Sequence, residues 1–147
     1  MTTPTGLGSQ LAPICDAGYF EMLTRAVFQA GFRPEIVDAR WPAFRTAFQG
    51  FDVDAVAAFG RSDVERLLAD DAIVRNSRKI EATVRNAIAL QALVREHGSV
   101  RAWLRTTADL PWPERVAVVA GTFRGIGPDG ARAFLGLSGE AVPQPGS

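Results

Sequence analysis

One nine-residue segment near the end of the chain, FRGIGPDGA (residues 123–131), carries residue types that can bind an anion. Its central residues are Arg124, Gly125, Ile126, Gly127, Pro128 and Asp129. The glycines leave backbone N–H groups uncovered, and a proline followed by an aspartate suits the first turn of a helix. Uncovered amides beside a helix N-terminus form a natural site for a phosphate.

The segment stands between two apolar runs, VAVVAG before it and ARAFLGL after it. A helix, a Gly-hydrophobic-Gly turn and a second helix form the pattern of the helix-hairpin-helix module, which holds a DNA phosphate through backbone amides and reads no base. Ile126 would anchor the turn in the core, and Arg124 and Arg132 would add positive charge. A plain turn between two helices is the alternative interpretation.

Glu21, Arg25 and Gln29 form a polar stripe at helical spacing. The stripe can be a solvated helix face with an i,i+4 ion pair, or it can line the rim of a pocket with Gln29 turned towards a ligand. Trp41 and Phe44 could provide stacking for a planar group. Their spacing, continued by Phe48, equally suits a hydrophobic core.

Three basic residues, Arg75, Arg78 and Lys79, precede or open the longest expected helix. They are either a charged loop or contacts to phosphate. His97, before Gly98, is interpreted most simply as a helix C-terminal cap. Cys15 has no visible base partner in the sequence, and a single cysteine and a single histidine cannot form a structural zinc site unaided.

Helical spacing dominates the elements that must position these residues, and no useful alternating strand pattern appears. We expect a compact all-α fold of seven or eight short helices, with the hairpin near the C-terminus. A capping box at Ser62–Glu65 predicts one helix start. The longest helix is predicted at about 77–97, with Gly98 as its stop and with these residues inward: Ile80, Val84, Ala87, Ile88 and Val94. Residues 1–13 and 141–147 are predicted as tails around one domain, 14–140.

The bulk composition excludes several classes of protein. The chain has 147 residues, a net charge of zero and 47% hydrophobic residues, which is ordinary for a globular domain. No apolar run approaches the roughly 20 residues of a membrane span, and the N-terminus does not have the pattern of a signal peptide. The zero charge argues against nucleic-acid binding driven by bulk charge, although a local basic patch can suffice.

Three segments together resemble the type I 3-methyladenine DNA glycosylases of the helix-hairpin-helix superfamily. They are YFEMLTRAVFQAGF (19–32), residues 51–90 and FRGIGPDGARAFLGLSGE (123–140). The phrases FEM, QAG, DVERLL and IVRNSRKIEA match in order and spacing, and the resemblance covers roughly residues 19–140. It implies hydrolysis of the N-glycosidic bond of alkylated purines, after the base is flipped into an aromatic pocket.

The sequence departs from this family where the lesion is recognised. The family's glutamate lies three positions before the glutamine of QAG, and that position is Ala26 here. The family's following tryptophan falls at Pro34, and its N-terminal aromatic segment and four zinc ligands are missing. The catalytic residue is therefore unassigned, with Glu21 and Gln29 as weak candidates. Asp129 stands where strand-cleaving relatives carry a lysine, which disfavours lyase activity.

Two functions from different classes remain. One is a monofunctional glycosylase of base excision repair, and the other is a catalytically silent or specificity-altered homologue that binds DNA or a partner. A helical domain unrelated to DNA is a third. We expect no metal and no cofactor, a base pocket with Gln29, Trp41 and Phe44, and DNA contacts from the basic residues and the hairpin. The expected partner is double-stranded DNA with alkylated bases, for a monomer of the bacterial cytoplasm.

Overall fold

The computed structural model describes residues 15–30 and 33–140, and every described element is helical, which confirms the all-α prediction. The elements are α2 (Asp16–Gln29), α3 (Pro34–Ala39), α4 (Trp41–Ala47), the 3-10 helix η1 (Gln49–Phe51), α5 (Val53–Ala57), α6 (Arg61–Leu68), α7 (Ser77–His97), α8 (Val100–Thr106), α9 (Trp112–Thr122) and α10 (Pro128–Leu137). The predicted tails, 1–13 and 141–147, lie outside the described residues.

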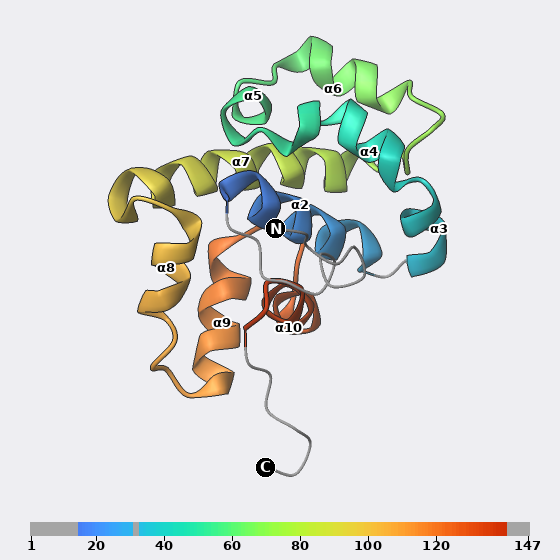
Figure 1. The fold of residues 1–147 in the computed structure, drawn as a ribbon. Coiled ribbons are helices and arrows are strands. Elements are labelled where there is room, and N and C mark those ends of the chain that lie inside the picture. The colour runs from blue at the N-terminus through green and yellow to red at the C-terminus, as the bar shows by residue number, and fades with distance from the viewer. Residues whose placement is uncertain (1–14, 31–32, 141–147) are drawn as a thin grey trace, which may run out of the picture.

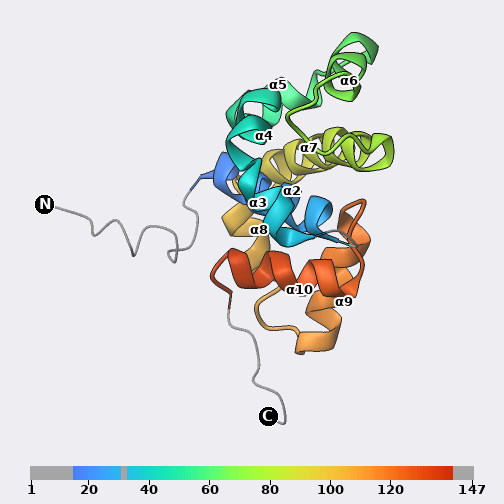
Figure 2. The same cartoon turned by 90° about the vertical axis from the view of Figure 1, so that its right-hand side faces the viewer.

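The two long helices α2 and α7 pack against each other in the middle of the molecule. Helices α4–α6 lie on one side of this pair, and α9 and α10 lie on the other, in both views (Figures 1 and 2), while α3 and α8 pack against α2. Helix α10 packs on α9 and on α2. The C-terminal hairpin is therefore brought against a helix that lies more than ninety residues earlier in the sequence.

Local signals account for the bounds of α7. The side chain of Asn76 accepts a hydrogen bond from the backbone N–H of Lys79 at 3.1 Å, which caps the first turn. Gly98 ends the helix with a φ of +93°, a conformation that favours glycine. The predicted range of about 77–97 agrees with the structure.

Two details of the predicted elements are wrong. Helix α6 begins at Arg61, and the side chain of Asp63 accepts from the N–H of Gly60 at 3.0 Å, so the capping residue is Gly60 and Ser62 lies inside the helix. Ile88 was expected inward but is 49% exposed, because it lies in an open pocket that it shares with Val64 of α6. Asn86, a polar residue, is fully buried on the same helix.

No helix among the described residues is long and apolar enough to cross a membrane.

Candidate functional site

The hairpin between α9 and α10 is fixed by a buried asparagine from α7. The side chain of Asn86 accepts from the backbone N–H of Arg124 at 2.7 Å and donates to the carbonyl of Arg124 at 3.0 Å. One amide side chain thus satisfies both backbone groups of one residue of the turn. Ile126 is buried, as the sequence predicted for the residue that anchors the hairpin.

Gly125 is required by its own conformation and by its neighbours. Its φ is +80°, and a Cβ built there would lie 3.1 Å from the Cβ of Ala82 and 3.2 Å from a methyl carbon of Val27. The hairpin therefore lies tightly against both central helices. Gly127 differs, because its φ is −98° and a Cβ there would meet nothing within 4 Å.

These two glycines give a matched pair of predictions. Gly125→Ala is expected to lower the free energy of unfolding by about 1–2 kcal/mol, since alanine is strained in the left-handed region and would press on Ala82 and Val27. Gly127→Ala is expected to change it by less than about 0.5 kcal/mol. Urea denaturation of both variants measures the difference, and equal losses would contradict the tight packing of the hairpin.

A pocket of about 450 Å³ lies between α2 and the start of α10, and we call it the α2–α10 pocket. Its lining residues are Ala26, Gln29, Ala30, Gly127, Pro128, Asp129, Gly130 and Ala133. Ala26 is almost fully buried, yet it borders this space. The position at which the resembling family carries its glutamate thus faces a pocket whose opposite wall is the hairpin and the first turn of α10.

The polar stripe of α2 is held by α3 and α4 and forms no ion pair within itself. Asp38 accepts from Arg25 at 2.5 Å and from the Gln29 amide at 3.0 Å. Glu21 accepts from the Trp41 indole N–H at 2.7 Å, and it also pairs with an arginine of α4. The i,i+4 ion pair considered for the stripe is therefore wrong, because each charged member finds a partner from another helix.

The aromatic residues expected around a base lie in the core. Trp41 is 2% exposed and Phe44 is fully buried, and their rings stack with centroids 5.0 Å apart. The guanidinium carbon of Arg25 lies 4.4 Å from the centroid of the Trp41 ring, so a cation covers that ring. This geometry agrees with the core interpretation of the pair, and their role in base stacking stays a prediction.

Lys79 points towards the end of α2. Its ammonium group donates to the carbonyls of Val27 and Ala30, both at 2.6 Å, and so caps the negative end of that helix. Burial lowers the pKa of Lys79 from its ordinary value. The DNA contact expected of this lysine stays a prediction, and the structure gives its ammonium group an intramolecular role.

Lys79→Met keeps the aliphatic stem and removes both hydrogen bonds. We expect the free energy of unfolding to fall by about 2 kcal/mol, the usual contribution of hydrogen bonds from a charged donor. Arg78→Met, one residue away and exposed, is the control and should change stability little. A loss of DNA affinity at unchanged stability in Lys79→Met would contradict the capping role.

The other basic residues expected at DNA are exposed and lie on different elements. Arg75 pairs with Asp71 at 3.3 Å before α7, and Arg132 pairs with Asp129 at 2.9 Å on α10. Arg78 and Arg124 form no ion pair within residues 15–30 and 33–140. Such exposed pairs are weak, so Arg75 and Arg132 can exchange them for a phosphate.

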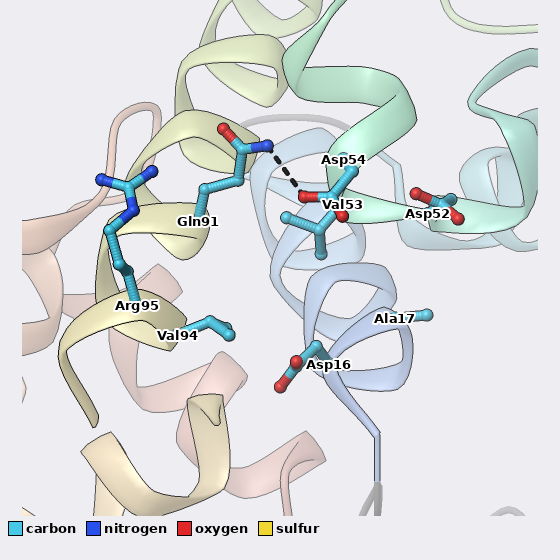
Figure 3. Close-up of a pocket in the computed structure, with 8 residues that line it drawn as sticks. All are labelled: Asp16, Ala17, Asp52, Val53, Asp54, Gln91, Val94 and Arg95. Carbon is cyan, nitrogen blue, oxygen red and sulfur yellow. Dashed lines mark hydrogen bonds between the residues drawn. The ribbon is translucent and has the colours of Figure 1, made fainter. Parts of the chain in front are cut away.

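A second pocket, of about 390 Å³, lies at the other end of the central pair, where α2, α5 and α7 meet (Figure 3). Its carboxylates serve the fold. Asp16 accepts from the N–H of Val100, Asp52 from the N–H of Ala55, and Asp54 from the Gln91 amide, at 2.8–2.9 Å. In the described part of the chain no three His, Cys, Asp or Glu side chains are grouped as metal ligands.

One protein family matches most of this chain. The family model for methyladenine glycosylase matches residues 12–120. The chain belongs to the methyladenine glycosylase family. The match includes α2 with Ala26 and the whole of α7, and it ends just before the hairpin.

Solved structures show the same fold in other proteins. A 3-methyladenine DNA glycosylase I superposes with a TM-score of 0.78 at 23% identity, covering 88% of this chain and 82% of that one. The Staphylococcus aureus enzyme gives 0.79 at 20% identity, covering 95% and 87%. A solution structure of 3-methyladenine DNA glycosylase I gives 0.72 at 24% identity, covering 90% and 81%. At these identities the likeness shows the fold.

Proposed function

We propose that the chain is a monofunctional DNA glycosylase of base excision repair that hydrolyses the N-glycosidic bond of alkylated purines in double-stranded DNA. The observation that carries this is the α2–α10 pocket, which opens beside the hairpin and reaches Ala26, the position of the family's lesion-contacting residue. A base flipped out of the duplex would enter the pocket while the hairpin holds the backbone. The family membership and the neighbours' activity support this assignment.

The chemistry asked of the pocket is modest. An alkylated purine with a positive charge already has a weakened bond to its sugar, so shape and a polar edge contact supply much of what is needed. Gln29 borders the pocket, although its amide nitrogen donates to Asp38. No lysine lines the pocket, which fits hydrolysis without strand cleavage.

The test is release of free base from methylated duplex DNA, followed by chromatography. We expect release of methylated purines above background and no strand scission. A purified, folded protein that releases no base, while an active glycosylase does so on the same DNA, would contradict the proposal. Ala26 in place of the family's glutamate favours the second candidate, a homologue that binds DNA without excision. That candidate predicts DNA binding that is weakened by Gly127→Asp, with no base released.

Asp129 is the one acidic residue among those lining the pocket, and it lies in the first turn of α10. Its carboxylate is fully exposed, and its pair with Arg132 is a surface pair that a cationic base can replace. Asp129→Asn is therefore expected to lower kcat for a cationic lesion only a few fold, because the charge that is removed is exposed to solvent. DNA affinity should hold or rise, because a negative charge is lost. Equal kcat in the variant and the parent would refute this role.

A further inference from the structure

A third pocket lies on the opposite side of the hairpin from the α2–α10 pocket. It measures about 440 Å³ and is lined by Arg78, Glu81, Ala82, Arg85, Arg124 and Gly125. We call it the arginine pocket. Residues 124–125 of the hairpin form its wall, whereas residues 127–130 form the wall of the α2–α10 pocket. The hairpin thus separates one space rich in positive charge from another that carries Ala26.

The arginine pocket concentrates charge in a chain whose net charge is zero. Three arginines line it, against one acidic residue, Glu81. None of the three arginines forms an ion pair in the part of the chain that the structure describes, unlike six of the chain's other arginines. Their donors are therefore available for an anion, and the planar guanidinium group suits two-point contact with phosphate.

The residues of this pocket are held in place by the fold. Arg78, Glu81 and Arg85 are spaced i, i+3 and i+7, which puts them on one face of α7. The backbone of Arg124 is fixed by both hydrogen bonds of Asn86. Ala82 has a small side chain and Gly125 has none, so neither residue occupies the space between the arginines. The site is thus positioned by two rigid elements.

We propose that the arginine pocket binds one backbone phosphate of DNA, separately from the amides of the hairpin. The choice of DNA as the ligand rests on the proposed function. The arginine pocket would hold a phosphate on one side of the hairpin while the flipped base occupies the α2–α10 pocket on the other. Arg85 becomes a DNA-binding residue that no sequence motif indicated. The arginines neutralise the phosphate and read no base.

The test is the salt dependence of binding to an undamaged fluorescent duplex, measured by anisotropy. Arg85→Gln is expected to reduce the slope of log K against log salt by about 0.9, the value for one lost phosphate contact. Affinity at 0.1 M salt would then fall about eightfold. Arg95→Gln, on the same helix about 15 Å further along, removes an equal charge outside this pocket and should leave the slope unchanged. Equal effects in both variants would overturn the proposal.

Removal of the charge of Glu81 is an independent test of the same site. Glu81→Gln is expected to strengthen DNA binding severalfold, while Glu96→Gln, exposed on the last turn of α7, should not. If Arg78 and Arg85 contact the same phosphate, the double variant Arg78→Gln, Arg85→Gln loses about one unit of the slope of log K against log salt in total. A loss of two units would mean two separate phosphates and would overturn the single site.

Two further outcomes separate this site from the enzymatic proposal. Because the duplex is undamaged, the slope changes are expected even if the protein releases no base. Inorganic phosphate at 10 mM, compared with chloride at equal ionic strength, should displace little DNA, since a backbone phosphate is held by neighbouring contacts as well. Full displacement by inorganic phosphate would indicate a site for the free ion and overturn the assignment to DNA. Absence of any duplex binding by the parent protein would overturn it as well.

Discussion

Ala26→Glu is expected to raise base release from methylated DNA by about 10- to 100-fold. The side chain of Ala26 borders the α2–α10 pocket, so a glutamate there can extend into open space of about 450 Å³. A hydrogen bond that a charged carboxylate accepts from an N–H of the lesion contributes about 1.5–3 kcal/mol, and about 1.4 kcal/mol corresponds to tenfold in rate. The gain should be largest for cationic lesions such as 3-methyladenine.

The control for this variant is Ala133→Glu, which adds the same side chain to the same pocket from α10. It should not reproduce the gain, because its carboxylate enters from the opposite wall. Thermal unfolding of both variants checks that the additional charge is tolerated. A folded Ala26→Glu protein with unchanged base release would show that the register with the family's glutamate does not carry the chemistry.

The helices could be predicted because the signals that set their bounds are local. The range of α7 followed from apolar spacing and a glycine stop, both within the segment itself, and the structure adds the cap from Asn76. Helix α10 followed from Pro128 and Asp129 in its first turn. The capping residue of α6 is Gly60, two positions before the predicted Ser62. The reason is that Asp63 accepts a hydrogen bond from the N–H of Gly60, which starts the helix earlier.

The partners of the polar residues could not be predicted in the same way. Lys79 bonds carbonyls 49 and 52 positions earlier in the chain, and Asn86 bonds a residue 38 positions later. Such contacts depend on how α2, α7 and the hairpin pack, and the spacing of residues along one helix cannot predict them. Arg85 was missed for the same reason, since only the approach of the hairpin brings Arg124 to the same pocket.

The alignment with the family's motifs indicated one feature that the residue types alone conceal. An alanine on a helix suggests nothing chemical, and only its place three residues before Gln29 marked Ala26 as a site position. The structure adds that this alanine lies at a pocket and not inside the aromatic core. Trp41 and Phe44, whose residue types suggested a base pocket, are packed in that core, and their role in base stacking stays a prediction.

Asn86→Leu is expected to have the largest effect on stability and on DNA binding together. The asparagine is fully buried and makes both backbone hydrogen bonds of Arg124. A leucine of similar size leaves these two groups without their side-chain partner, and each such loss costs about 1–3 kcal/mol. We expect the free energy of unfolding to fall by about 2–4 kcal/mol, and DNA affinity to fall because the hairpin and the arginine pocket lose their shared support.

The control is Thr83→Val on the same helix. Thr83 is equally buried, but its hydroxyl bonds the carbonyl of Lys79 within α7, so its loss should not reach the hairpin. Hydrogen exchange separates the two effects. In Asn86→Leu the Arg124 amide should exchange about a hundredfold faster than in the parent, as the loss of about 2.7 kcal/mol of local protection implies. If stability falls but the protection of the Arg124 amide is unchanged, Asn86 supports the core and does not fix the hairpin.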